Sequence, residues 1–385
     1  MAGPTRYSIV SYGGMVTCEP RMSAYAEALR QAVTPGCTVI DIGAGPGVFS
    51  LLACRYGAGH VIAIEPDDSV ELLRQLAADN GCADRITIVQ GLSTDFDPPA
   101  RADVIISDIR GCLPLFEGHI RTVADARARL LAPGGTLIPA RDTLRIALVE
   151  SQEDGDSVEQ PWLRNKFGLD LAAGQRFAAN SWWKVKLEAK DLLCDPVTLG
   201  TLDYDRISEP NFTGRVDLTV ARTGSAHGLL VWFDAELAPG IGFSNAPGAP
   251  PLIYGQTFLP LEAAVKVAPG DRAAVEFTAT LVDGSYVWGW DSVFHQSGGS
   301  APLASFRQST FLSKVMSPQS LRRRANGYVV PAREIHAIDR LCLSLIDGKR
   351  TLEDIALRLL SEFPARFADR TQALNHVAEL TNRYR

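Results

Sequence analysis

Two carboxylates stand nine positions apart in a mostly apolar loop, Asp108 near its start and Glu117 at its end. Charged groups in such surroundings are costly to leave unpaired, so they usually hold a cation or share a proton. A guanidinium offers a planar fork of donors that two carboxylates can clamp, and an alkylammonium could lose its proton to the same pair. The loop therefore predicts a site that orients a nitrogen nucleophile, with Asp108 and Glu117 as catalytic residues. In the alternative, Asp108 caps the loop or the next helix and Glu117 is solvated.

A glycine-rich turn provides the second chemical signal. A strand-like run containing Asp41 leads into Gly43, Gly45 and Gly47, a spacing that differs from the G-x-G-x-x-G of dinucleotide enzymes. Glu65 ends the next strand-like run, where an acid accepts hydrogen bonds from ribose hydroxyls. The combination favours an adenosine-containing ligand without a pyrophosphate, S-adenosylmethionine (SAM). A glycine turn used only for packing, a solvated Glu65 and a nicotinamide cofactor are the alternatives.

The elements that position these residues form an alternating pattern up to about residue 145. Apolar, β-rich runs at 37–42, 60–64, 86–89 and 103–106 are interleaved with helical patterns at 48–56 and 69–80. Strands that are apolar on both faces and separated by helices predict a parallel sheet covered on both sides, a Rossmann-like α/β domain. The acid loop follows the fourth run, at the edge where such sheets bind substrate.

Two further regions follow. From about 143 to 297, short alternating strands such as 216–220, 229–233, 273–281 and 286–290 predict an antiparallel β-barrel or sandwich. After about 322, a β-like run at 327–330 precedes helices at about 332–346 and 351–363. We expect domains at 1–142 (SAM binding), 143–315 (substrate and dimerisation) and 316–385 (a small helical or winged-helix domain).

Several segments resemble the protein arginine methyltransferases. The acid loop is similar to that family's double-glutamate loop, with the same spacing. The segment 13–25 is similar to its cofactor-lid helix, whose methionine lies on the cofactor and whose arginine pairs with the cofactor carboxylate. The segment 130–139 looks like its transition into the barrel, and 167–170 resembles part of its dimerisation arm. The resemblance implies SAM as methyl donor, S-adenosylhomocysteine as product, and a homodimer.

The chain also departs from that family. Asp108 stands where the family has glutamate, one methylene longer, so a bidentate clamp on a guanidinium would be displaced. The family's Thr-His-Trp loop reads Leu-Ile-Tyr at 252–254, a glutamate near the adenine reads Thr94 after Ser93, and Tyr12 replaces a frequent histidine. The cofactor side is thus better preserved than the acceptor side.

Residue roles follow from the motifs and the resemblance together. The expected cofactor-binding residues are Met15, Arg21, Asp41, Gly43, Gly45, Gly47, Glu65, Pro66, Ser93 and Thr94. The expected substrate-binding residues are Tyr12, Arg110 and Tyr254. The tryptophans at 182, 183, 288 and 290 either line an acceptor channel or belong to the core.

The segment 341–356 is similar to the PqqD-like family, small domains that bind leader peptides of ribosomally made, modified peptides. That resemblance implies a short peptide substrate delivered by its leader. The alternative is a helical cap packed on the barrel or at a dimer interface.

Composition limits the function classes. The 385 residues carry a net charge of −6, which disfavours a protein that coats nucleic acid. The chain has no signal-peptide pattern and no apolar stretch of the ~20 residues that span a bilayer, so we expect no membrane partner. Dispersed cysteines and histidines predict a reduced, cytoplasmic protein without a metal.

The leading hypothesis is a SAM-dependent N-methyltransferase acting on a ribosomally made peptide. One alternative is N-methylation of free arginine or another small natural-product intermediate. Another is a degenerate methyltransferase that serves as a peptide-binding scaffold.

Overall fold

The structure is a computed structural model that describes residues 7–164 and 166–384. Residues 1–6, the start of the expected first domain, lie outside the described residues. The chain divides into two compact units, Met1–Val315 and Met316–Arg385, each with its own apolar core. Among the described residues, no helix combines the length and apolar character needed to cross a membrane.

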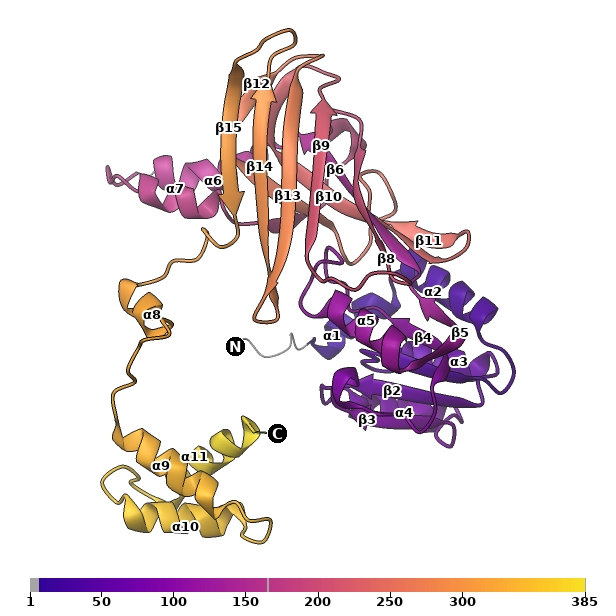
Figure 1. Cartoon of the computed structure of the whole chain (residues 1–385), viewed down its shortest axis with the longest axis vertical. Coiled ribbons are helices and arrows are strands. Elements are labelled where there is room, and N and C mark those ends of the chain that lie inside the picture. The colour runs from indigo at the N-terminus through magenta and orange to yellow at the C-terminus, as the bar shows by residue number, and fades with distance from the viewer. Residues whose placement is uncertain (1–6, 165, 385) are drawn as a thin grey trace. The chain divides into compact units, whose positions relative to one another are not determined.

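The first half of the larger unit is a five-stranded parallel sheet in the order β3-β2-β1-β4-β5 (Figure 1). Its strands are β1 Thr38–Ile42, β2 His60–Glu65, β3 Ile86–Gln90, β4 Ala102–Ser107 and β5 Leu131–Ile138. The helices are α3 Val48–Arg55, α4 Val70–Asp79 and α5 His119–Arg129, with a short 3-10 helix η1 at Ser93–Asp95. The two central strands β1 and β4 are almost wholly buried because helices cover the sheet, as their apolar runs predicted. The Rossmann-like prediction is confirmed.

The N-terminal lid segment consists of two helices, α1 Ile9–Val16 and α2 Glu19–Ala32, where the sequence suggested one. The Thr17 hydroxyl donates to the carbonyl of Gly13, closing the first helix. Pro20 lies in the first turn of α2, a position where its missing N–H costs nothing. The break thus separates Met15 on α1 from Arg21 on α2.

The second half of the larger unit is antiparallel and consists of two sheets. The first has the order β7-β12-β10-β6-β8, with β11 paired to β10, and the second has the order β15-β14-β13-β9 (Figure 1). The first sheet contains β6 Arg141–Val149, β7 Trp183–Val185, β8 Val197–Asp203, β10 Gly224–Ala238, β11 Ile241–Ser244 and β12 Gln256–Val267. The second contains β9 Phe212–Thr219, β13 Arg272–Val282, β14 Ser285–His295 and β15 Pro302–Ser309. Helices α6 Gln152–Leu163 and α7 Ala172–Ala178 and the 3-10 helix η2 Ala189–Asp191 complete it.

Alternation of buried and exposed side chains along β13 is typical of a sheet with one face on the core, as the sequence pattern predicted. In register with it on β14, Trp290 lies opposite Phe277, and both are fully buried. Trp290 and Trp288 therefore belong to the core, whereas Trp182 reaches the pocket described below.

The smaller unit is helical. It contains α8 Pro318–Arg323, α9 Glu334–Leu345, α10 Leu352–Glu362 and α11 Arg370–Asn382. The two predicted helices are present as α9 and α10, and Thr351 and Asp354 cap α10 reciprocally. The predicted β-like run at 327–330 is wrong: Val329 and Val330 are exposed, and no strand to pair with occurs within 316–384.

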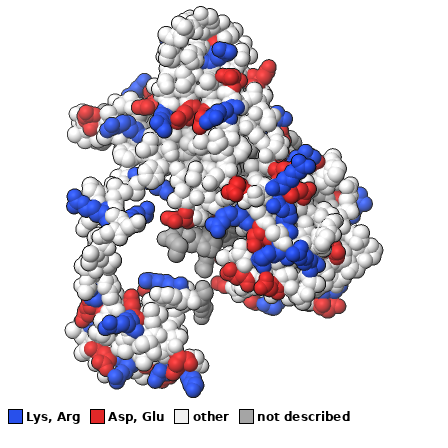
Figure 2. Space-filling model, viewed as in Figure 1, with Lys and Arg blue, Asp and Glu red and all other residues white. Residues whose placement is uncertain are grey.

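Figure 2 shows that acidic and basic side chains are interspersed on the displayed face of each unit. This mixture fits the small net charge of −6.

Candidate active site

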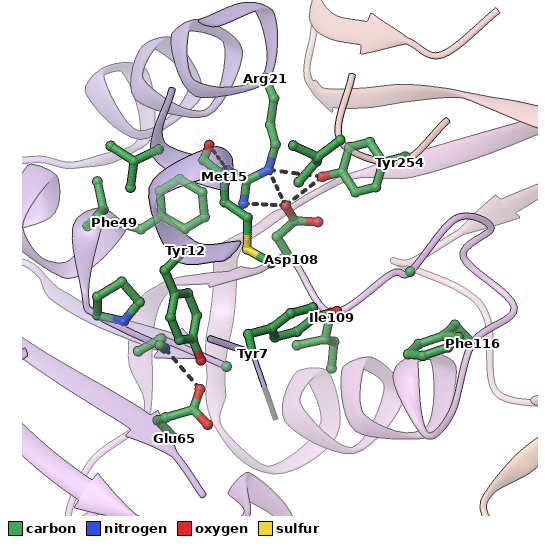
Figure 3. Close-up of a pocket in the computed structure, with 18 of the residues that line it drawn as sticks. Tyr7, Tyr12, Met15, Arg21, Phe49, Glu65, Asp108, Ile109, Phe116 and Tyr254 are labelled. Atoms are coloured by element: carbon green, nitrogen blue, oxygen red, sulfur yellow. Dashed lines mark hydrogen bonds and ion pairs between the residues drawn. The ribbon is translucent and has the colours of Figure 1, made fainter. Parts of the chain in front are cut away.

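A pocket of about 470 Å³ opens where β1, β2 and β4 end, below the lid helices and beside the loop that precedes β12 (Figure 3). At the carboxyl edge of a parallel sheet, the connections that follow two neighbouring strands lead in opposite directions. The space between these connections is where such sheets bind a ligand. Both signals identified in the sequence, the glycine turn and the acid loop, line this one pocket.

The glycine turn forms one end of the pocket. Gly43 and Gly45 have positive φ values of 72° and 52°. A Cβ on Gly43 would lie 2.4 Å from the Ile109 side chain, and one on Gly45 would lie 2.7 Å from the Tyr12 ring. Both positions therefore require glycine, and the bare backbone leaves a cradle for a ligand.

Glu65 lies beside this cradle at the end of β2. Its carboxylate accepts hydrogen bonds from the backbone N–H of Gly45 and of Asp67, both at 2.9 Å. Burial raises the pKa of Glu65, and the two amide donors oppose that shift. These bonds hold the acid on the pocket wall, where Pro66 also contributes.

Asp41 and Gly47 support the turn without lining the pocket. The Ser50 hydroxyl donates to one Asp41 oxygen at 2.7 Å, and the other oxygen has no hydrogen-bond partner among the described residues. Burial raises the Asp41 pKa to about 7. Gly47 caps α3 with φ +79°, and a Cβ there would lie 1.9 Å from Leu73. A bare cradle with an unsatisfied buried carboxylate oxygen near it suits a ligand that carries a cationic amino group.

Arg21 and Asp108 meet at the middle of the pocket. Nε and Nη2 of Arg21 donate to Oδ2 of Asp108 at 2.6 and 2.5 Å, and the Tyr254 hydroxyl donates to the same oxygen at 2.6 Å (Figure 3). Burial alone would raise the Asp108 pKa, but Arg21 and Arg110 outweigh it and lower the pKa to about 2. Asp108 is therefore an anion at every physiological pH. Arg21 was expected to meet the cofactor carboxylate, and in the structure its guanidinium lies on Asp108.

Arg110, expected to contact substrate, does not line the pocket. It lies behind Asp108 with no exposed surface, and its Nε donates to Asp108 Oδ1 at 3.2 Å. Its Nη1 donates to Asp142 at 2.7 Å and its Nη2 to the Tyr25 hydroxyl at 2.5 Å. Tyr204 donates to the other Asp142 oxygen at 2.5 Å. Arg110 thus connects the acid loop to a buried polar network.

Glu117, at the far end of the acid loop, is half-buried on the pocket wall. Its backbone has φ +43°, a left-handed conformation that is uncommon for glutamate. Gly111 allows the loop to fold tightly, because a Cβ there would lie 2.5 Å from the Phe116 ring. The loop fold brings its two acids to the same cavity, as their spacing suggested.

The pocket collects most of the residues expected from the sequence. Those that line it are Tyr12, Met15, Arg21, Gly43, Gly45, Glu65, Pro66, Asp108, Glu117 and Tyr254. Those that do not are Asp41, Gly47, Ser93, Thr94 and Arg110. Ser93 is buried in η1, and Thr94 is exposed.

Other lining residues escaped sequence analysis. They include Tyr7, Phe49, Phe116, Lys184 and Ile253. Lys184 and Ile253 belong to β7 and the loop before β12, more than sixty residues from the acid loop. Their presence depends on how the antiparallel half packs against the parallel half, which no local motif encodes.

Comparison with known proteins matches both halves of the larger unit. Residues 140–283 match the arginine methyltransferase oligomerization subdomain, and residues 23–140 match the ribosomal protein L11 methyltransferase (PrmA) family. An arginine N(omega)-methyltransferase from Streptomyces achromogenes is 30% identical over 268 residues, which cover 68% of this chain and 73% of that protein. Rice protein arginine N-methyltransferase 1 is 28% identical over 248 residues, 63% of this chain. The chain spans 64% of the length of that rice relative.

Solved structures share the fold. The Trypanosoma brucei PRMT1 enzyme–prozyme heterotetrameric complex with AdoHcy has a TM-score of 0.72 at 22% identity, covering 78% of this chain and 96% of that one. Arabidopsis thaliana protein arginine methyltransferase 10 has a TM-score of 0.69 at 20% identity, covering 78% and 97%.

Proposed function

The chain belongs to the arginine N-methyltransferase family, and on that basis we propose that it is a SAM-dependent N-methyltransferase acting on a guanidine or amine nitrogen. One observation carries the proposal: the glycine cradle, Arg21 and the two loop acids all line a single pocket. We assign residues 1–142 to SAM binding, 143–315 to acceptor binding and dimerisation, and 316–385 to a PqqD-like or helical C-terminal domain.

In the proposed complex, Glu65 receives the ribose hydroxyls, and Met15 covers the cofactor from α1. Arg21 would hold the cofactor carboxylate through Nη1, since its Nε and Nη2 stay on Asp108. Asp41, behind the glycine turn, would offset the charge of the cationic amino group. Pro66, Ser93 and Thr94 remain assigned to the adenosine side, with Ser93 and Thr94 at its margin. SAM would supply a methyl group already activated by its sulfonium, so the protein needs to supply positioning and charge.

Glu117 carries the acceptor in this proposal, with Asp108 beside it. Asp108 already accepts three bonds on one oxygen, from Arg21 and Tyr254, so its shorter side chain is tied to the lid. Glu117, half-buried on the same pocket wall, is in this proposal the acid that clamps the incoming guanidinium or ammonium and directs its nitrogen to the methyl group. Tyr12 and Tyr254 line the pocket between the side proposed for the cofactor and the side proposed for the acceptor.

For the acceptor, we retain a ribosomally made peptide. Its support is a helical unit with its own core and a helix–Asp-Gly–helix layout like that of PqqD-like domains. Free arginine is the second candidate, because the Streptomyces relative is named an arginine N(omega)-methyltransferase.

A homodimer and a cytoplasmic location complete the proposal. The dimer is supported by the match to an oligomerization subdomain and by Phe167 and Leu169, exposed by 84% and 60% between α6 and α7. The location is supported by seven cysteines that are all buried and unpaired.

Glu117→Gln tests the function, because it removes the charge while keeping the shape of the side chain. We expect methyl transfer to fall by about 100-fold or more, the scale seen when one transition-state electrostatic contact is lost. Calorimetry should show nearly unchanged SAM binding. Glu71→Gln, on the exposed side of α4, is the matched control and should leave both measurements unchanged.

Unchanged turnover in Glu117→Gln would remove the acid loop from the mechanism. A wild-type protein that neither binds SAM nor transfers a methyl group would instead favour the scaffold hypothesis.

A further inference from the structure

Lys184 faces the acceptor side of the pocket. It lies on the short strand β7, in register with Thr257 of β12. Side chains alternate along a strand, so Trp182 and Lys184 both line the pocket, whereas Trp183 points the other way and packs on Phe258 with ring centroids 5.0 Å apart. The pocket is therefore lined by a cation from the antiparallel half as well as by acids from the parallel half.

The loop before β12 holds the Lys184 side chain in place. Gly255 has φ +61°, and a Cβ there would lie 2.6 Å from Cγ of Lys184, so the lysine stem lies directly on the bare loop backbone. The ammonium donates to the carbonyl of Ile253, another pocket residue. The stem is thus supported along its length, although Lys184 is an exposed residue.

The ammonium has no carboxylate partner among the described residues. Lys184 is exposed as a whole residue, but partial desolvation of its ammonium lowers its pKa. An ammonium has three donors, and the Ile253 carbonyl uses one of them. An anionic group that enters the pocket would therefore meet a cation with donors still available.

The charges of the pocket therefore form a pair of opposite poles. Glu117 and Asp108 bring negative charge to the pocket wall, with Asp108 already paired to Arg21 and Arg110, and Lys184 brings positive charge from β7. Cys112 lies on the acid loop between the two acids, is buried, and feels the charge of Lys184. A ligand that matches both poles is a zwitterion.

We propose that Lys184 binds a carboxylate of the acceptor, so that the enzyme selects a guanidine or amine that carries a carboxylate a few bonds away. This inference rests on the proposed function, since it takes the pocket to hold a methyl acceptor. The carboxylate belongs either to a free amino acid or to an acidic group beside the methylated residue of a peptide. The ligand chemistry is the same in both cases.

The test compares acceptors with and without a carboxylate. Binding of L-arginine, agmatine (arginine without its carboxylate) and N-acetyl-arginine amide is measured by calorimetry on the full chain saturated with S-adenosylhomocysteine. Methyl transfer to each is measured in parallel with SAM. A fourth ligand, N-acetyl-aspartyl-arginine amide, distinguishes the peptide source of the carboxylate from the free amino acid.

We expect wild-type protein to favour L-arginine over agmatine, or N-acetyl-aspartyl-arginine amide over N-acetyl-arginine amide, by roughly 10- to 100-fold, the scale of one charged hydrogen bond. Lys184→Met, which keeps the stem without the charge, should remove that preference. Lys186→Met is the matched control, an exposed lysine two positions along that does not line the pocket, and it should keep the preference.

Equal affinity within both pairs of ligands in wild type, or a preference that survives in Lys184→Met, would overturn the role of Lys184. Methyl transfer without that preference would leave the proposed function intact. A carboxylate preference in binding without any methyl transfer would support Lys184 and count against the proposed function.

Discussion

Arg110 lies between two buried acids, Asp108 on one side and Asp142 on the other. Burial would lower the pKa of this guanidinium, but Asp142 and the other anionic partners outweigh it and raise the pKa. A buried ion pair contributes little compared with an apolar replacement, yet breaking one side of it is costly because a buried charge is left alone. Arg110 is therefore a positioning residue: it fixes the Asp108 carboxylate from behind.

Replacing Arg110 by Met should destabilise the larger unit by about 3–5 kcal/mol, the usual cost of leaving a buried charge unpaired. Urea unfolding measured by circular dichroism gives the change. Arg141→Met is the control, because the Arg141–Glu236 pair is solvent-exposed and should contribute at most about 1 kcal/mol.

The double variant Arg110→Met with Asp142→Asn should recover part of the loss, because it removes the uncompensated charge as well. Equal destabilisation by Arg110→Met and Arg141→Met would show that the network does not hold the acid loop.

At the scale of elements, the turn from β1 into α3 must satisfy both the ligand and the packing. Gly43 and Gly45 leave the pocket open, whereas Gly47 allows α3 to start against the Leu73 side chain of α4. The same glycine pattern thus has two physical causes, and substitution can separate them.

Gly47→Ala should cost about 1–3 kcal/mol beyond the strain of a positive φ, because its Cβ overlaps Leu73. Gly36→Ala is the matched control: Gly36 has φ +82° but open space, so only the backbone strain of about 1–2 kcal/mol applies. Urea unfolding of both variants measures the difference. Equal losses would mean that Leu73 yields without cost.

The sequence predicts the parallel sheet well because each strand is an apolar run bounded by turn residues. Helices α3 and α4 begin and end within two residues of the predicted positions. The sequence predicts secondary structure less well where a strand forms only if another strand pairs with it. The apolar residues at 327–330 have the composition of a strand, but no partner strand exists to pair with them.

The residues of the candidate site also fall into two groups, those with a local sequence signal and those placed by distant parts of the chain. Glu65 and the acid loop carry local signals, a strand end and a fixed spacing. The partners of Arg110 do not: Asp142 is 32 positions away and Tyr25 is 85. The position of Lys184 depends on β7 pairing with β12, about seventy residues later.

At the scale of the whole molecule, the two units have separate cores. Every buried residue of the larger core precedes residue 316, and the core of the smaller unit runs from Ile338 to Leu380. Since each core is complete by itself, the stability of one unit should not depend on the other.

A chain ending at Val315 should therefore unfold at the same urea concentration as the larger unit of the full chain. It should also bind S-adenosylhomocysteine with unchanged affinity, because the described residues that line the pocket all lie before residue 316. Transfer to a small guanidine acceptor should stay within about two-fold.

For a peptide that the helical unit helps to bind, KM should rise about ten-fold or more with kcat unchanged, because tethering supplies a local concentration in the millimolar range. Adding the 316–385 fragment separately at micromolar concentration should not restore the KM, since it lacks that tether. A loss of transfer to small acceptors on truncation would show instead that the helical unit takes part in forming the active site.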